Sequence, residues 1–195
     1  MVRGSKFDPA EFTGAALLLL SEGGPSAVTM QAIARRSGAP TGSIYHRFPS
    51  RSAVVAAAWL EALTAFADHV ETAMNIAAPD AAAALIAWAR AHSREARALF
   101  LNEPASLFDT APPEDLSAAI RAQEARIERA FKPGPARAVD AEAFARLRFA
   151  VIDGPIALIR PYLQLGEPIP VFIDAVAADL GRLAAPAGAV SRAAE

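Results

Sequence analysis

The sequence contains no cysteine, which excludes disulfide bonds, zinc sites with cysteine ligands and thiol catalysis. It also lacks long apolar runs, and stretches such as residues 15–20 and 81–89 are short. Both fall far short of the roughly 18 to 20 residues that cross a bilayer. Asp8 and Glu11 interrupt the N-terminal stretch that would otherwise resemble a secretory leader. We therefore expect a cytoplasmic protein with no membrane partner.

Patterns typical of enzymes and metal sites are also missing. The sequence has no glycine-rich phosphate loop and no recognisable Ser-His-Asp order. The three histidines, His46, His69 and His92, show neither an i,i+4 spacing nor a His-Glu-x-x-His motif. We expect no metal, no cofactor and no catalytic residue.

Charge is distributed unevenly along the chain. Residues 1–51 contain six basic and three acidic side chains, a net charge of +3, whereas the remaining residues carry −5. A basic segment attracts a polyanion and releases its counterions on binding, while an acidic segment is repelled. The charge pattern favours nucleic acid as a partner of the N-terminal segment.

The sequence predicts an all-α protein, because alternating apolar and polar runs are absent and β-branched residues are few beside alanine and leucine. Asp8, Pro9 and Glu11 form a capping box with proline at the first helical position, and Phe7 can pack on Phe12. Glycine and proline positions divide the chain further. The expected helices after the first, which ends at Gly23, cover residues 29–38, 41–48, 50–76, 80–93, 94–103, 114–131, 140–164 and 168–184, with loops at 104, 112–113, 133–135 and 166–168.

Residues 29–48 have the form of a helix-turn-helix. Two short helices are separated by a turn at Gly38, and Ile44 and Phe48 lie four residues apart on one face of the second helix. In such a unit the second helix enters the major groove of DNA with its outward residues. The side chains left outside are of the types that contact phosphates and base edges, namely Thr41, Gly42, Ser43, Tyr45, His46 and Arg47.

Residues 28–51, VTMQAIARRSGAPTGSIYHRFPSR, closely resemble the DNA-binding domain of tetracycline-repressor-type (TetR) regulators. That family's pattern runs from a threonine through isoleucine-alanine and a turn glycine to a short helix with tyrosine, histidine and phenylalanine, then a basic residue. Ala39 stands where valine is usual, and Arg51 where lysine is usual. The resemblance covers residues 7–59.

The resemblance implies a homodimeric regulator whose variable body binds a small ligand and thereby loses affinity for its operator. Carried over by position, Thr29, Ser43 and Arg51 would contact DNA phosphates. The groove would be lined by Thr41, Gly42, Tyr45, His46 and Arg47. Residues 1–50 would form the DNA-binding domain and residues 51–195 the ligand-binding and dimerisation domain, linked by the helix over 50–76.

Two segments near the C-terminus are candidates for the dimer interface. The predicted helix over 140–164 has two apolar stripes, one through Phe144 and Val151 and one through Phe149 and Ile156, so it needs covering from two sides. The segment 168–184 adds a further apolar face. We expect these two segments to form a four-helix interface across a two-fold axis.

Aromatic and histidine side chains of the body could line a mostly apolar cavity. Ordinary core packing is the favoured explanation of any single one of these aromatic side chains, and an apolar or aromatic effector is the alternative. The candidate ligand-binding residues are Trp59, Phe66, His69, Trp88, His92, Phe100 and Phe108.

The favoured function is a repressor that leaves operator DNA when a small molecule binds. One alternative is a small α-helical enzyme, to which Asp153 in the apolar segment 150–159 points, unless it pairs with Arg146, with Arg160 or with an arginine across the dimer. A helical protein that binds a partner but no DNA is the other alternative. It would leave the composition of residues 41–51 unexplained.

Overall fold

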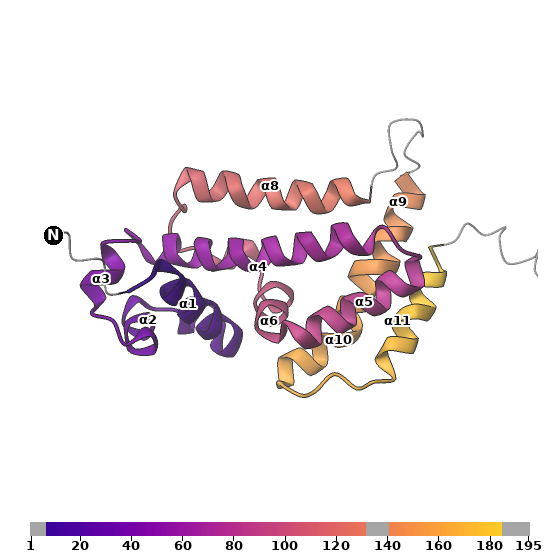
Figure 1. Cartoon of the computed structure of the whole chain (residues 1–195), viewed down its shortest axis with the longest axis horizontal. Helices are drawn as coiled ribbons and strands as arrows, with labels where there is room; N and C mark the ends of the chain where they lie inside the picture. The colour runs from indigo at the N-terminus through magenta and orange to yellow at the C-terminus, as the bar shows by residue number, and fades with distance from the viewer. Residues whose placement is uncertain (1–6, 132–140, 185–195) are drawn as a thin grey trace, which may run out of the picture. The chain divides into compact units, whose positions relative to one another are not determined.

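A computed structural model describes residues 7–131 and 141–184, and these residues form helices and turns without a strand (Figure 1). The all-α prediction is therefore confirmed. The elements are α1 (Pro9–Gly23), the 3₁₀ turn η1 (Pro25–Ala27), α2 (Met30–Ser37), α3 (Thr41–Tyr45), α4 (Arg51–Ala73), α5 (Ala78–Ala91), α6 (Ser93–Leu101), α7 (Pro104–Leu107), α8 (Glu114–Ala130), α9 (Ala141–Arg148), the π-helical turn η2 (Phe149–Asp153), α10 (Gly154–Leu165) and α11 (Ile173–Arg182).

The start of α1 has the predicted cap. The Asp8 side chain accepts a hydrogen bond from the backbone N–H of Ala10 at 3.1 Å, and the Glu11 carboxylate accepts one from the N–H of Asp8 at 3.2 Å. The rings of Phe7 and Phe12 lie 6.4 Å apart, centroid to centroid. Local sequence therefore fixes where the first helix begins.

The chain divides into two compact units. One comprises residues 1–65 and 94–123, and the other residues 66–93 and 124–195. The chain passes from one unit to the other within α4, at the first residue of α6, and within α8. The predicted functional boundary between residues 50 and 51 remains a prediction.

In the first unit, α1 packs against α2, and α2 against α3. The contact surfaces are apolar, and the side chains of Phe12, Ile33 and Ile44 have no exposed surface. Burial of a branched or aromatic side chain of this size contributes about 1.5 to 3 kcal/mol. Since α2 and α3 are too short to be stable alone, this packing is what keeps them helical.

In the second unit, α11 lies against α5 (Figure 1). The backbones approach so closely at Gly181 that a Cβ atom there would lie 2.5 Å from the carbonyl oxygen of Ala78. The same pair is joined by Arg90, whose guanidinium binds the Asp174 carboxylate at 2.7 and 2.9 Å. Only a residue without a side chain permits this crossing.

The predicted helix over 140–164 is present as a continuous helical segment over 141–165, formed by α9, η2 and α10. It contains one π-helical turn, η2, in which the N–H of Gly154 bonds to the carbonyl of Phe149, five residues earlier. Pro155 follows and has no N–H to continue the i to i−4 ladder, so the wider turn accommodates the break. Residue 140 and the predicted loop at 133–135 lie outside the described residues.

Two other helix boundaries differ from prediction. A short helix, α7, forms where a loop at Pro104 was expected. The helix predicted from residue 168 begins only at Ile173, because Pro168 and Pro170 restrict the backbone before it.

One helix, α4, is long and apolar enough to cross a membrane by length and composition alone. The short apolar runs in the sequence did not predict this. However, 61% of its most apolar window is buried in the protein, as in the core helix of a soluble protein.

Candidate nucleic-acid interface

The helix-turn-helix is built from α2, a tight turn and α3. The side chain of Thr29 accepts a hydrogen bond from the N–H of Ala32 at 3.0 Å and so caps α2. Gly38 ends α2 in the left-handed conformation, with φ of 68°, and a Cβ there would meet nothing within 4 Å. The glycine is therefore required by backbone conformation and not by space. Pro40 then precedes α3.

One buried side chain fixes the orientation of α3. Ile44 is fully buried, whereas its neighbour Tyr45 is 52% exposed. The helix is shorter than the predicted 41–48, but the N–H of Phe48 still bonds to the carbonyl of Ile44 at 2.8 Å. This last turn holds His46 and Arg47 beside Tyr45, and both are exposed.

The structure places seven of the eight predicted DNA-binding residues on or beside the accessible surface of this unit. Thr29, Gly42, Tyr45, His46 and Arg47 are exposed, and Thr41 and Ser43 are half-buried. A Cβ at Gly42 would meet no atom within 4 Å. The surface of α3 at this point is open, and a phosphate or base edge could approach its backbone.

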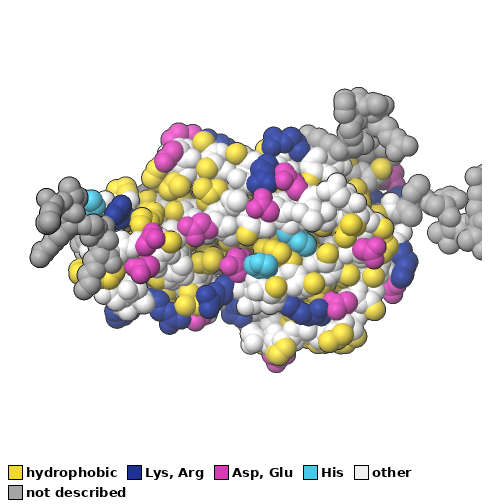
Figure 2. Space-filling view, in the orientation of Figure 1, with side chains coloured by type: hydrophobic (Ala, Val, Ile, Leu, Met, Phe, Trp, Pro, Cys, Tyr) yellow, Lys and Arg dark blue, Asp and Glu magenta, His cyan; other side chains and the backbone are white. Residues whose placement is uncertain are grey.

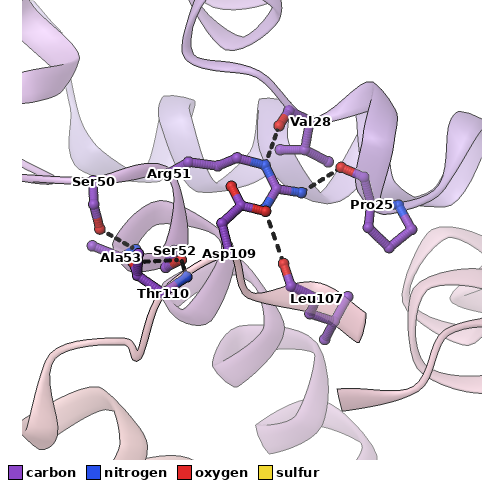
Figure 3. A network of polar contacts seen from close by, with 9 residues as sticks. All are labelled: Pro25, Val28, Ser50, Arg51, Ser52, Ala53, Leu107, Asp109 and Thr110. Carbon is purple, nitrogen blue, oxygen red and sulfur yellow. Dashed lines mark hydrogen bonds and ion pairs between the residues drawn. The ribbon is translucent and has the colours of Figure 1, made fainter. Parts of the chain in front are cut away.

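Arg51 is the exception, because its side chain points into the protein (Figure 3). Its guanidinium donates to the carbonyl of Val28 at 2.6 Å, to that of Leu107 at 3.0 Å and to the Asp109 carboxylate at 2.8 Å. It also donates to the carbonyl of Pro25. With only 17% of its side chain exposed, Arg51 is engaged within its own unit and is not presented to a phosphate.

Other charges near this surface are paired or dispersed. Arg36 forms an exposed ion pair with Glu22 at 3.1 Å. On the face drawn in Figure 2, basic and acidic side chains are interspersed and do not gather in a large patch of one sign.

Four of the seven predicted ligand-binding residues form a cluster in the second unit, here called the ring cluster. Trp88 lies at its centre, 5.2 Å from Phe66, 5.7 Å from His69 and 5.0 Å from His92, measured between ring centroids. The two imidazoles stack on it with interplanar angles of 27° and 16°. Phe66 and Trp88 are buried and His92 is exposed.

His69 has an unusual environment within the ring cluster. Its Nε2 atom is buried and has no hydrogen-bond partner in the structure. Burial lowers the pKa of His69 below its ordinary value of 6.5, and the neighbouring His92 lowers it further. At neutral pH His69 is therefore uncharged, and its buried Nε2 atom has no hydrogen-bond partner in the structure.

A small cavity lies beside His69. Its volume is about 10 Å³, roughly the space of one water molecule, and its other lining residues are apolar: Val70, Ala73, Met74, Ala81, Leu85, Val151 and Ile152. A drug-sized molecule needs several hundred Å³, so this cavity would have to widen to accept one. The remaining predicted ligand-binding residues, Trp59, Phe100 and Phe108, belong to the other unit.

Asp153, the carboxylate that kept an enzyme among the alternatives, is exposed and lies 3.4 Å from Arg148. The predicted partners Arg146 and Arg160 were therefore wrong. Arg146 pairs instead with Glu142. Within residues 7–131 and 141–184, no three acidic or histidine side chains gather as they would to hold a metal ion.

Comparison with known proteins agrees with this geometry. Residues 13–58 match the family model of bacterial regulatory proteins of the tetR family. No curated protein sequence matches the chain. The match includes α2, the turn and α3.

Solved structures share the whole fold at low sequence identity. The transcriptional regulator FadR from Bacillus subtilis, solved with stearoyl-CoA, is 12% identical with a TM-score of 0.63, over 91% of this chain and 97% of that one. A protein from Shewanella sp. PV-4 described as a tetR family transcription regulator is 18% identical with a TM-score of 0.64, over 90% and 96%. The fatty acid degradation regulator FadR from Bacillus halodurans is 14% identical with a TM-score of 0.61, over 91% and 97%. From the helix-turn-helix and the family match, residues 13–58 form a DNA-binding domain of the tetR family, and the chain shares its fold with these solved transcriptional regulators.

Proposed function

We propose that this regulator is a homodimeric repressor that reads operator DNA with α3 and leaves it when a small, apolar effector binds in the body of the protein. The observation that carries the first part is the burial of Ile44, which turns Tyr45, His46 and Arg47 outward. The proposed division of labour is a DNA-binding domain over 1–50 and an effector and dimer domain over 51–195. Regulators of this family work in the cytoplasm, and we place this one there.

The DNA contacts follow from the exposed chemistry. The hydroxyl groups of Thr29 and Ser43 are suited to phosphate oxygens, which fix the position of the protein on the duplex. Arg47 can pair with guanine through two N–H groups, and the other exposed residues can contact base edges or methyl groups. The remaining groove-facing residues in this proposal are Thr41, Gly42, Tyr45 and His46. Arg51 is left out because its donors are used inside the protein.

A homodimer is supported by apolar side chains that the second unit leaves exposed. Exposure of a large hydrophobic side chain to water costs free energy. A contiguous patch of such side chains on a protein surface therefore marks an interaction site. Symmetric dimers are the usual assembly of regulators that read two half-sites. The exposed large hydrophobic side chains in the predicted dimer segments are Phe149, Val171, Phe172, Val176 and Leu183.

An apolar effector is supported by the ring cluster and by one structural neighbour. The B. subtilis FadR structure contains stearoyl-CoA, a molecule with a long apolar chain. The ring cluster offers aromatic surface around one uncharged imidazole nitrogen, and the cavity beside it has an apolar lining. We propose that an effector enters next to His69 and Trp88 by widening this cavity.

Tryptophan fluorescence can test the effector site, because the chain has two tryptophans and only Trp88 lies in the ring cluster. Titration with long-chain fatty acids and acyl-CoAs should quench the emission of wild type and of Trp59→Phe. The Trp88→Phe variant, which retains Trp59, should show little quenching. Equal quenching in both variants would place the ligand elsewhere.

DNA binding itself can be tested by a gel shift with the DNA that flanks the protein's own gene. A dimer that contacts about six to ten phosphates should lose roughly 10³- to 10⁵-fold in affinity between about 50 and 200 mM salt. Retention of the fragment with this steep salt dependence supports the proposal. Failure to retain any fragment, in a protein that is folded by circular dichroism, would contradict it.

A further inference from the structure

The end of α1 and the connection that follows it, residues 21–28, are held by arginine side chains from two other helices. Arg97 in α6 donates from Nε to the carbonyl of Ser21 at 2.7 Å. Arg51, the first residue of α4, donates from Nε to the carbonyl of Val28 at 2.6 Å and from Nη2 to that of Pro25. Both ends of this connection are therefore anchored from outside the helix-turn-helix.

The guanidinium of Arg51 also holds the segment between α7 and α8. Its Nη1 atom donates to the carbonyl of Leu107, a fully buried residue, at 3.0 Å, and to the carboxylate of Asp109 at 2.8 Å (Figure 3). One side chain thus bonds to two segments that are about eighty residues apart in the sequence.

The next residue of α4 strengthens the same contact. Ser52 is buried, and its hydroxyl oxygen accepts a hydrogen bond from the N–H of Thr110 at 3.2 Å. The two hydroxyl groups of Ser52 and Thr110 lie 3.3 Å apart. The first turn of α4 therefore lies between the 25–28 segment and the 107–110 segment and bonds to both (Figure 3).

The donor count of Arg51 decides between this role and a phosphate contact. A guanidinium has five N–H groups, and four are directed at acceptors inside the unit. To reach a phosphate, the side chain would have to leave three backbone carbonyls, two of them belonging to the buried residues Val28 and Leu107. A lysine could not replace it, because an ammonium has three donors on a single atom and cannot span a planar set of acceptors.

We propose that Arg51 is a positioning residue: it locks the 107–110 segment to the α1–α2 connection, so that the orientation of α2 and α3 follows the position of that segment. The segment leads directly into α8, which begins at Glu114 and continues beyond residue 123 into the second unit. A shift at the start of α8 is thereby transmitted to the DNA-reading helix. Only the naming of α3 as the DNA-reading helix rests on the proposed function. The proposal that Arg51 holds the two segments together does not.

Hydrogen exchange of the full-length protein, followed by mass spectrometry, tests the lock without DNA or effector. In Arg51→Lys, amides within residues 25–33 and 107–113 should exchange about tenfold faster than in wild type, while those of α5 and α11 keep their rates. The matched control is Arg121→Lys, since Arg121 makes an exposed ion pair with Glu114 in the same unit. Arg121→Lys should leave the exchange rates of residues 25–33, residues 107–113, α5 and α11 unchanged.

A second variant and a binding measurement complete the test. Asp109→Ala removes one acceptor at a side chain that is 66% exposed, so it should fold and should speed exchange mainly within 107–113. With a DNA fragment that the wild type retains, Arg51→Lys should bind about tenfold more weakly with an unchanged dependence on salt. A phosphate contact by Arg51 predicts instead that Arg51→Gln flattens the salt slope by about 0.9 per subunit.

Three results would overturn the proposal that Arg51 holds the 107–110 segment to the α1–α2 connection. One is unchanged exchange within 25–33 and 107–113 in Arg51→Lys. Another is equal acceleration throughout the chain, including α5 and α11, which would mean a general loss of stability. The third is a flattened salt slope in Arg51→Gln. If the wild type retained no DNA, the proposed function would fail while the exchange result still decided the lock.

Discussion

Ile44 and Tyr45 are adjacent in α3, yet Ile44 has no exposed surface and Tyr45 exposes 52% of its own. This contrast sets the rotation of the helix about its axis, because a buried branched side chain cannot turn outward without leaving a cavity. Every residue proposed to contact DNA from α3 depends on it.

Replacing Ile44 by alanine should destabilise the protein by about 2 to 5 kcal/mol, because the side chain is removed from a fully packed site. Urea unfolding followed by circular dichroism measures the change. Tyr45→Ala is the matched control and should alter the free energy of unfolding by less than about 0.5 kcal/mol, as exposed substitutions do. Equal losses in the two variants would show that Ile44 does not anchor α3.

Two glycines of the helix-turn-helix should respond in opposite ways to alanine. At both positions a Cβ would meet no atom within 4 Å, but only Gly38 has a positive φ, of 68°. Gly38→Ala should therefore cost about 1 to 2 kcal/mol of stability, from the left-handed backbone alone. Gly42→Ala, inside a helix, should raise stability by up to about 1 kcal/mol.

The same pair separates stability from DNA binding. If a phosphate or base edge approaches the backbone at Gly42, the added methyl group should weaken operator binding although the variant is more stable. Thermal unfolding and fluorescence anisotropy with labelled DNA give the two readings. Wild-type affinity in Gly42→Ala would remove this residue from the interface.

Much of the helix-turn-helix could be predicted because its signals are local. The cap at Asp8 and Glu11, the cap at Thr29 and the turn at Gly38 each depend on residues no more than four positions away, and the structure has all of them. The inward face of α3 followed from the four-residue spacing of Ile44 and Phe48. Ile44 is buried, whereas Phe48, which lies beyond the end of α3, is only half-buried.

The role of Arg51 could not be predicted, because its partners are distant in the sequence. The carbonyl of Val28 is 23 residues away and the Asp109 carboxylate 58 residues away. A backbone carbonyl can come from any residue type, so no pattern marks it. The π-helical turn before Pro155 is different: proline inside a predicted helix is a direct signal of a local irregularity, and the apolar stripes on either side obscured it.

The uncharged state of His69 predicts a pH-dependent stability. Because burial lowers its pKa below the ordinary 6.5, the unfolded chain binds a proton at higher pH than the folded protein does. The free energy of unfolding should therefore fall as pH drops below about 6.5, until the folded protein also takes up the proton. Urea titrations between about pH 8 and pH 5 measure this.

The contribution of His69 is isolated by His69→Phe, which keeps an aromatic ring in the ring cluster and cannot titrate. This variant should lose less stability over the same pH range. His46→Gln serves as the control, since His46 is exposed and belongs to the other unit. A wild type and a His69→Phe variant with the same pH dependence would show that His69 is not held neutral by the fold.

The dimer proposal predicts a change of mass from one substitution. Phe172 is 61% exposed and lies just before α11, within the predicted interface. Light scattering should give twice the chain mass of 20.4 kDa for the wild type and a mass near one chain for Phe172→Glu. Glu114→Arg, at an exposed site in the other unit, should remain dimeric. A monomeric wild type at micromolar concentration would reject the proposal.

The central claim, that the outward surface of α3 reads DNA, is tested most directly by the affinity of three variants for the DNA that flanks the gene. Tyr45→Ala and Arg47→Ala should each weaken specific binding by about tenfold to a hundredfold, the worth of one base contact, without changing the unfolding transition. Arg36→Ala, which removes an arginine paired with Glu22, should bind nearly as the wild type does. Wild-type affinity in both Tyr45→Ala and Arg47→Ala would contradict the account.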